Sequence, residues 1–457
     1  MSMSAAGSTN TPVTIVVGLN GALQKRFIMG SGGSQLIPGN VHRATQVQTG
    51  VGGKGQDVAI SLSCLQYYYR SSNQDKDEDG TASSDDPGTI QLAQFIGVGG
   101  EGDTVLNLLR KRLMGESESE STDDSSCFAL TVRPTSALRT CTSIVSTKET
   151  TELVEPSGII SKDEMKQLME QLTTLASAEG DNDNDGIETL VIMGTMPPGC
   201  DEDTYAKIYD IVASPKNTLC VIDSVIGTVP LLQTISSKKN KKTTKNGSVG
   251  GTIFKVNASE LCNLVKVPRS SKSEMGGVNL EELTSALTKF MYDSSGDISE
   301  FSNYSPSAIS AMAITDGPHP GYLCVNNDYY SGSDDGKDDG GELTLYQVPI
   351  PLLNKNEEMP LYPIGAGDSV AAGTSAAWNC LVRGDSSERN ILPPNVKEAL
   401  DTYRQKLSEG KVGDSSNDQH HVLLTAFAFG LACGSASKYS CFQAMVTSLR
   451  GLRNVIV

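Results

Sequence analysis

The sequence predicts an α/β fold in which helices cover both faces of a mostly parallel central sheet, with a small β lid beside it. Short apolar runs of strand length alternate along the chain with runs of helical periodicity, as in repeated βαβ units. Two β-rich regions, at about 24–49 and 127–155, break this alternation and have the pattern of antiparallel strands. We therefore expect a single domain over residues 1–457, with the lid formed by these two regions.

The expected elements follow one another in a regular order. Strands are predicted at Val13–Leu19, Ile90–Gly97, Glu188–Gly194, Thr218–Asp223, Thr252–Asn257 and Ala308–Thr315. The helices between them have apolar residues three or four positions apart, and they span Gly55–Gln66, Thr104–Leu113, Lys162–Ala176, Glu202–Ala213 and Leu280–Tyr292. Further helices are expected at Gly367–Leu381, Asn395–Leu407, Val422–Ser437 and Cys441–Leu449.

Five polar segments interrupt this pattern. They are rich in Ser, Asp, Asn, Gly or Lys and contain little that could be buried, so we expect mobile, disordered insertions. They span Ser71–Gly88, Gly115–Ser126, Glu179–Gly186, Ser236–Gly251 and Asn326–Gly341. The lysines in 238–245 have no aromatic residue or apolar face beside them, which favours a solvated loop over a binding patch.

The composition argues against several classes of protein. A net charge of −17 opposes nucleic-acid binding, which needs a basic surface. No apolar run approaches the ~20 residues that span a bilayer, and residues 1–12 lack the apolar segment of a secretory signal. The ten cysteines form no CxxC pair, so we expect free thiols in a reducing compartment. We therefore expect a cytoplasmic protein with neither nucleic acid nor membrane as partner.

A glycine-rich turn at 363–367 opens directly into an apolar helix. Gly365 and Gly367 allow a sharp turn and a close approach of the backbone to a ligand. The N–H groups of the helix start suit an anion such as a transferred phosphate. Asp368, in the first turn, is placed to accept a proton from an attacking hydroxyl. The alternative is a structural helix start in which Asp368 is only a capping residue.

A second glycine-rich helix entry lies at 50–55 and contains Gly53 and Lys54, with Asp57 shortly after it. The glycines permit a close approach of backbone to ligand, and the two charged side chains can face a polar substrate. This entry is not a P-loop, because neither Ser nor Thr follows the lysine.

Two further motifs follow expected strands. Asn257 and Glu260 stand three positions apart at a helix entry, where an amide and a carboxylate can hold the water shell of Mg²⁺. A capping box is the alternative interpretation of this pair. Thr315 ends a strand, and a tight turn through Gly317 follows it, as in nucleotide-contacting loops at the carboxyl ends of strands.

Outside its insertions, the chain resembles the PfkB (ribokinase-like) carbohydrate kinases over nearly its whole length. Gly-Ala-Gly-Asp at 365–368 resembles their C-terminal signature, Gly-Gly-Lys-Gly at 52–55 their N-terminal one, and 257–260 their NxxE element. The segments that resemble the 1-phosphofructokinase and tagatose-6-phosphate kinase group are 19–23, 38–44, 151–156 and 193–199. The resemblance implies a ribokinase-like three-layer sandwich and ATP-dependent transfer of a phosphoryl group to a hydroxymethyl group of a sugar or sugar phosphate.

The resemblance also implies roles for individual residues. Asp368 becomes the base, the turn of Gly365, Ala366 and Gly367 the anion hole, and Asn257 with Glu260 the Mg²⁺-associated pair. The implied substrate-binding residues are Gln24, Gly53, Lys54, Asp57, Arg139 and Glu152, with Lys54 and Arg139 as candidates for a substrate phosphate. The implied nucleotide-binding residues are Thr315, Gly317, Gly365, Gly367 and Gly434. ATP and Mg²⁺ are the implied cofactors, and the exposed edges of the lid suggest a homodimer.

Two positions depart from the family's pattern at the sugar end of the site. Gln24 stands where these kinases have Asp, and Asp57 stands where they have Asn. A carboxylate only accepts hydrogen bonds whereas an amide also donates, so we expect a changed sugar preference. Two alternatives stay open, namely a kinase of an unphosphorylated sugar or nucleoside, and a non-catalytic sugar- or nucleotide-binding protein on the same scaffold. The intact Asp368 and its turn favour an enzyme.

A GxGxxG pattern at 97–102 is the main competing motif, because it is typical of dinucleotide-binding proteins. The pattern is weak alone, and only a polar insertion lies ~20 residues further on, where such proteins carry an acidic residue at a strand end. We therefore disfavour a dehydrogenase.

Overall fold

The structure is a computed structural model. It describes residues 13–30, 36–74, 89–114, 125–146, 150–178, 187–213, 218–240, 250–268, 277–292, 308–327, 329, 343–350, 365–383, 392, 394–409 and 416–437.

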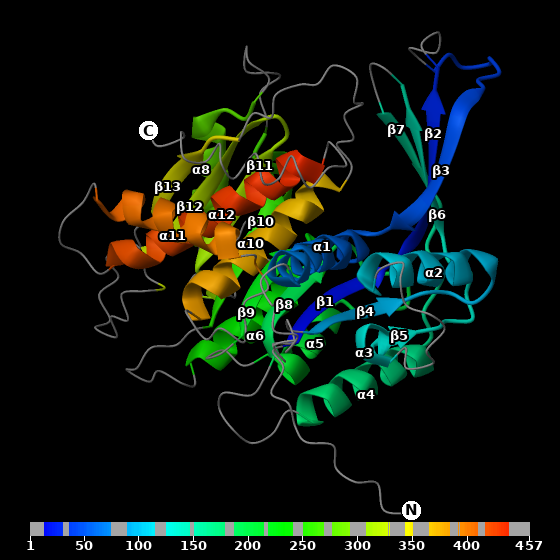
Figure 1. The fold of residues 1–457 in the computed structure, drawn as a ribbon, viewed down its shortest axis with the longest axis horizontal. Coiled ribbons are helices and arrows are strands. Elements are labelled where there is room, and N and C mark those ends of the chain that lie inside the picture. Colours follow the sequence, from blue (N-terminus) through cyan, green and yellow to red (C-terminus); the bar gives the residue numbers. More distant parts are fainter. Residues whose placement is uncertain are drawn as a thin grey trace, which may run out of the picture.

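Nine strands of the described residues form the central sheet, in the order β13-β12-β11-β10-β9-β8-β1-β4-β5 (Figure 1). From β11 to β5 all neighbouring strands are parallel, and β12 and β13 add an antiparallel edge. The strands are β1 (Val13–Asn20), β4 (Thr89–Phe95), β5 (Thr131–Val132), β8 (Ile187–Met193), β9 (Leu219–Asp223), β10 (Gly251–Asn257), β11 (Ala311–Asp316), β12 (His319–Asn326) and β13 (Leu343–Val348). The prediction of a mostly parallel sheet is confirmed.

Helices cover both faces of this sheet, so each strand buries side chains on two sides. On β1, for example, Val16 faces one apolar cluster while Ile15 and Val17 face the other. The helices of the first cluster are α1 (Lys54–Gln74), α2 (Gly100–Met114), α10 (Ala366–Arg383), α11 (Pro394–Glu409) and α12 (Ser416–Ser437). Those of the second are α4 (Lys162–Ala178), α5 (Thr204–Val212), α6 (Thr228–Asn240), α7 (Ala258–Leu264) and α8 (Leu280–Tyr292). A short α3 (Ser125–Phe128) precedes β5.

A second, four-stranded sheet stands out from one side of the body (Figure 1). Its order is β3-β2-β6-β7, built from β2 (Ala22–Met29), β3 (Ala44–Gly52), β6 (Thr140–Val145) and β7 (Thr150–Val154). The expectation of purely antiparallel pairing is wrong at its centre, where β2 and β6 are parallel. Both strands begin at the same end of this sheet, where Leu23 lies beside Thr140, and they therefore run in the same direction.

Several expected boundaries also need correction. Within the expected insertions, residues 71–74 continue α1, 125–126 begin α3, 236–240 end α6, Gly251 begins β10 and Asn326 ends β12. Nearly all of the remaining insertion residues, and the helix expected at 441–449, lie outside the described residues. Helices α6 and α7 were not predicted from the sequence, because polar residues are interspersed in both.

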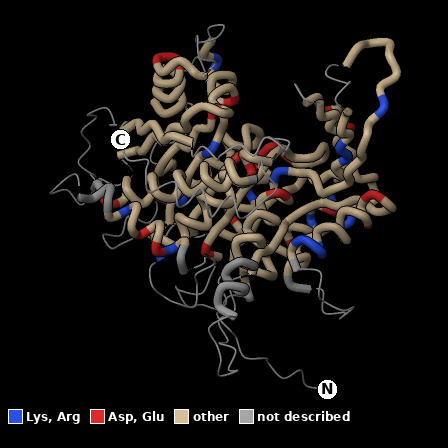
Figure 2. Tube along the Cα trace, turned by 45° about the horizontal axis from the view of Figure 1, so that its top comes forward, with Lys and Arg blue, Asp and Glu red and all other residues tan. Residues whose placement is uncertain are grey.

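Three general properties follow from the described part of the chain. Every cysteine in it is a free thiol. None of its helices has the length and apolar character to cross a bilayer. Along the trace in Figure 2, acidic and basic residues lie interspersed rather than segregated onto separate faces.

Helices α10 and α12 pack at unusually short range, because glycines line their contact. A Cβ atom on Gly430 would lie 2.6 Å from the carbonyl oxygen of Val370, and one on Gly373 would lie 2.6 Å from Cys433 Sγ. This contact fixes the axis of α10, the helix that begins at the predicted anion hole.

Gly430→Ala should therefore destabilise the fold. Alanine is favoured over glycine by about 1 kcal/mol inside a helix. The new methyl would meet Thr374 Oγ1 at 2.1 Å as well as the Val370 carbonyl, and overpacking costs about 1–3 kcal/mol. We expect a net loss of up to about 2 kcal/mol in the free energy of unfolding in urea. Gly100→Ala is the control, since a methyl there meets nothing within 4 Å; equal stability of the two variants would contradict the packing argument.

Candidate active site

The carboxyl ends of the parallel strands bring the polar residues of the site to one edge of the sheet. Met193 lies beside Asp223 at the ends of β8 and β9, and Asn257 lies beside Thr315 on β10 and β11. Gly194, just after β8, has a φ of 76° and donates its N–H to the Asp223 carbonyl at 2.8 Å. This edge is where open α/β sheets bind ligands.

A buried carboxylate joins two lysines at this edge. Lys54 Nζ, at the start of α1, donates to Asp223 Oδ1 at 2.9 Å, and Lys255 Nζ, on β10, donates to Asp223 Oδ2. The side chains of Asp223 and Lys255 are only 3% and 5% exposed. Burial alone would raise the pKa of Asp223, but the charges of Lys255 and Lys54 outweigh it and hold that pKa below its usual value. The carboxylate therefore stays ionised and keeps both ammonium groups in place.

Lys54 keeps its proton for the corresponding reason. Burial alone would lower its pKa, but the charge and hydrogen bond of Asp223, aided by the charges of Glu260 and Asp368, raise that pKa above its usual value. A cation is thus fixed at the entry of α1, where the sequence predicted a ligand-binding turn.

Asp368 lies in the first turn of α10, beside these lysines, and is 7% exposed. The turn before it bends at Gly365, whose φ is 81°. The first intrahelical bond runs from the Ser369 N–H to the Gly365 carbonyl at 3.0 Å, so the amides of 366–368 precede it and point out of the helix start. Lys255 Nζ lies 3.5 Å from where a Cβ on Gly367 would be. Backbone amides and a cation therefore converge beside Asp368.

The pKa of Asp368 is raised to about 7, chiefly by burial and next by the charge of Asp223. Lys255 and Lys54 oppose this rise, and Glu260 adds to it. A carboxyl group with a pKa near neutrality suits general-base catalysis, because about half of it is ionised near pH 7 and the ionised form is basic enough to take a proton.

Asn257 and Glu260 form the capping box of α7. The Glu260 N–H donates to Asn257 Oδ1 at 2.8 Å, and the Asn257 N–H donates to Glu260 Oε2 at 2.9 Å. The alternative interpretation is thus observed, and it leaves Glu260 Oε1 facing Lys54 Nζ at 3.9 Å. Mg²⁺ usually keeps several waters and binds one or two carboxylates plus phosphates. Glu260 fits such a water-mediated role, whereas the Asn257 oxygen is already engaged.

A cavity of about 270 Å³ opens beside Lys54, Asp223 and Glu260. It is lined by charged side chains of both signs, by glycines of β1 and of the start of α1, and by the turn after β8, namely Gly18, Asn20, Lys54, Gly55, Gln56, Arg139, Met193, Gly194, Thr195, Asp223, Ser224, Val225 and Glu260. Asn20 is fixed on two sides, since its Nδ2 donates to Thr195 Oγ1 at 3.0 Å and its Oδ1 accepts from Ser157 Oγ at 2.8 Å.

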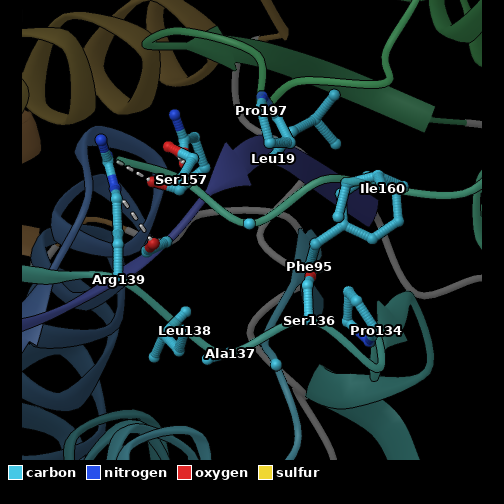
Figure 3. A pocket seen from close by; sticks show the side chains of 14 residues that line it. Leu19, Phe95, Pro134, Ser136, Ala137, Leu138, Arg139, Ser157, Ile160 and Pro197 are labelled. Atoms are coloured by element: carbon cyan, nitrogen blue, oxygen red, sulfur yellow. Dashed lines mark hydrogen bonds between the residues drawn. The ribbon is translucent and has the colours of Figure 1, made fainter. Parts of the chain in front are cut away.

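Arg139 closes one side of this cavity. Its guanidinium donates to the backbone carbonyls of Asn20 at 2.9 Å and Gly21 at 3.4 Å. Figure 3 shows the side chain extended toward the end of β1, with its head near Ser157. There it borders a smaller cavity of about 20 Å³. These bonds orient the guanidinium where it borders both cavities.

The predicted sugar residues of the lid form a chain of hydrogen bonds. Gln24 Nε2 donates to Ser143 Oγ at 2.6 Å, and Ser143 Oγ donates to Glu152 Oε1 at 3.3 Å. Gly53, with a φ of 119°, makes the turn into α1. Asp57 lies away from this chain, beside the turn of Gly365.

The predicted nucleotide residues lie in different settings. Thr315 shares the site edge with Asn257, and Gly317 makes the β11–β12 turn with a φ of 60°. Gly434 lies inside α12, where a Cβ would be 2.8 Å from the Ala366 carbonyl. Gly434 therefore supports the start of α10 by close packing.

The competing glycine pattern at 97–102 is a tightly packed turn. A Cβ on Gly102 would lie 1.8 Å from the Gly97 carbonyl, and Arg133 donates to that same carbonyl at 3.1 Å and to Asp103 at 2.6 Å. Contacts within the protein therefore require Gly97 and Gly102, and a φ of 101° requires Gly99.

The architecture can be compared with solved structures. Phosphofructokinase-2 from Escherichia coli, in its tetrameric inhibited form, matches with a TM-score of 0.55 and 16% identity over 97% of this chain and 99% of that one. The same enzyme in complex with substrates and products gives 0.54 and 17% over 96% and 99%. The chain has the ribokinase-like fold. A Thermotoga maritima protein described as a possible 1-phosphofructokinase shares this fold, with a TM-score of 0.51 and 13% identity over 96% and 97%. No family model matches the chain.

Two residues at the centre of this site, Asp223 and Lys255, were not predicted from the sequence. Both stand in apolar runs, Leu219–Asp223 and Thr252–Val256. A charged residue within an otherwise buried strand needs a partner, and that signal could have singled out both positions.

Asp223→Asn should destabilise the protein strongly, because it leaves the buried Lys255 ammonium without its carboxylate. Removing one partner of a buried ion pair costs about 3–5 kcal/mol, whereas an exposed pair contributes about 0–1 kcal/mol. Asp201→Asn, which breaks the exposed bridge to Lys207, is the matched control. Urea unfolding of both variants measures the loss of unfolding free energy. A loss for Asp223→Asn no larger than the loss for Asp201→Asn would show that Asp223 does not anchor Lys255.

Proposed function

We propose that this chain is a carbohydrate kinase of the PfkB family that transfers the γ-phosphoryl group of ATP to a hydroxymethyl group of a sugar or sugar phosphate. The observation that carries the proposal is the position of Asp368, buried in the first turn of α10 beside the helix amides and beside Lys54 and Lys255. A carboxylate, an amide-lined turn and fixed cations are the groups that phosphoryl transfer requires.

In this mechanism Asp368 takes the proton of the acceptor hydroxyl, and the resulting oxygen attacks the γ-phosphorus as the bond to ADP breaks. The amides of 366–368 and the Lys255 ammonium stabilise the charge on the transferred group. Mg²⁺, when bound, neutralises charge on the nucleotide phosphates, and Glu260 would hold it through water. Thr315 and Gly317 would contact the nucleotide from the neighbouring strand end.

On the acceptor side, Arg139 and Lys54 would bind a substrate phosphate, and Asn20 would orient the sugar in the 270 Å³ cavity. The lid chain of Gln24, Ser143 and Glu152 would contact sugar hydroxyls and exclude water on closure.

We also propose that the lid pairs with a second copy of the chain. We further propose that the enzyme acts in the cytoplasm, in keeping with the free thiols of the described residues.

Asp368→Asn should lower kcat by about 10²–10⁴-fold in an ATP-consumption assay, because general-base catalysis contributes that much. The assay needs a panel of acceptors, including fructose 1-phosphate, fructose 6-phosphate, tagatose 6-phosphate and ribose. The kcat/KM of the native enzyme should rise with pH and inflect near 7, since burial raises the pKa of Asp368 to about 7 and only the ionised form accepts a proton.

Asp163→Asn, at an exposed carboxylate in the first turn of α4, is the control. Equal rates for native protein and Asp368→Asn would remove the base assignment. No turnover with any acceptor would favour a binding protein on the same scaffold.

Arg139→Gln should raise KM for phosphorylated acceptors by about 10–100-fold, since a hydrogen bond to a charged group is worth about 1.5–3 kcal/mol. KM for unphosphorylated sugars should change far less. Arg133→Gln is the control, because Arg133 is held by Gly97 and Asp103 away from the larger cavity. An equal rise for both acceptor classes would instead favour a kinase of unphosphorylated sugars.

A further inference from the structure

The first turns of α1 and α10 meet side by side. Asp57 Oδ2 lies 3.7 Å from where a Cβ on Gly365 would be, and one turn further along both helices Ser61 Oγ lies 3.3 Å from Ser369 Oγ. Residues four apart share a helix face, so Asp57 faces Gly365 just as Ser61 faces Ser369. The carboxyl group of Asp57 therefore stands against the amide-lined turn that begins α10.

This arrangement places two carboxyl groups, Asp57 and Asp368, at one phosphate-binding turn. The cations nearest Asp368, Lys54 and Lys255, are already shared with Asp223. The charged groups that act on Asp57 are Asp368 from α10 and Arg26 from β2. Two ionised carboxylates at one site repel each other and would also repel an incoming phosphate, so such pairs hold one proton between them.

We propose that Asp57 is a protonated hydrogen-bond donor to the transferred phosphate, and that it shares a single negative charge with Asp368. This inference rests on the proposed function for the identity of its ligand, but the shared proton is a property of the free protein. A neutral carboxyl group donates one hydrogen bond, whereas the ionised form can only accept. The productive state therefore has Asp368 ionised and Asp57 protonated.

The surroundings of Asp57 favour this state. Burial and the charge of Asp368 raise its pKa well above the usual value, and Arg26 opposes them. The N-terminal dipole of α1 also favours the ionised form, but that effect is weaker than burial beside a like charge. A bound phosphate adds negative charge, which raises the pKa of Asp57 further and retains the proton.

The first test needs no turnover, because it follows the proton through protein stability. The native state holds on Asp57 a proton that the unfolded chain releases at lower pH. The stabilisation is complete below the unfolded pKa and is lost as pH rises through the folded pKa. Asp57→Asn lacks this titration, so its Tm minus the native Tm should grow with pH between the unfolded and the folded pKa of Asp57, by about 2 °C for each pH unit, and should level off above the folded pKa. Asp163→Asn, an exposed carboxylate, should show a constant difference. A constant difference for Asp57→Asn as well would overturn the proposal.

The second test examines the donor role, using the acceptor of the panel that gives the highest rate. The native kcat/KM should rise with pH as Asp368 ionises and then fall tenfold for each pH unit as Asp57 ionises. In Asp57→Asn the falling limb should be absent, because the amide keeps its N–H donor at every pH. In Arg26→Gln the falling limb should move to higher pH, because the variant lacks the cation that lowers the pKa of Asp57.

The two tests separate failure of the inference from failure of the proposed function. A falling limb that persists in Asp57→Asn would overturn the donor role. If no acceptor turns over, the absence of turnover counts against the kinase function alone. The Tm series then still decides whether Asp57 holds the proton.

Discussion

The site depends on one buried carboxylate that two lysines share. Asp223, at the end of β9, holds Lys255 on the neighbouring strand β10 and Lys54 at the start of α1. Because both hydrogen bonds are made at the carboxyl edge of the sheet, they join the main sheet to the helix that follows the lid. They also fix two positive charges beside the turn where α10 begins. Without them, the glycine turn would be an anion-binding helix start with no cation to reinforce it.

The charges around this carboxylate explain why neighbouring acids differ. Asp223 touches both lysines and remains ionised, with its pKa lowered. Burial and like charge raise the pKa values of Asp368 and Asp57; the like charge is that of Asp223 for Asp368 and that of Asp368 for Asp57. Glycines make this crowding feasible. Gly434 admits the start of α10 into contact with α12, and Gly365 brings its turn against α1.

Local patterns in the sequence predicted the alternating strands and helices, the glycine turns and Asp368, because each of these is encoded within a few neighbouring residues. Contacts between distant segments were harder to predict. Asp223 and Lys255 meet across two strands, and neither belongs to a recognisable local motif. The parallel pairing of β2 with β6 depends on how two remote segments enter the lid. The close packing of Gly434 against the start of α10 also depends on a contact between distant segments, α12 and α10. The resemblance to sugar kinases correctly predicted the ribokinase-like fold.

The most direct test of the central claim is a crystal structure with Mg²⁺, ADP, aluminium fluoride and an acceptor sugar. The fluoride group imitates the phosphoryl group in transfer. We predict that it lies between the amides of 366–368 and Lys255 Nζ, with the acceptor oxygen within hydrogen-bond distance of Asp368 and with the Asp223 bridge to both lysines intact. A fluoride group bound elsewhere, or an Asp368 carboxylate turned away from the acceptor, would contradict the account.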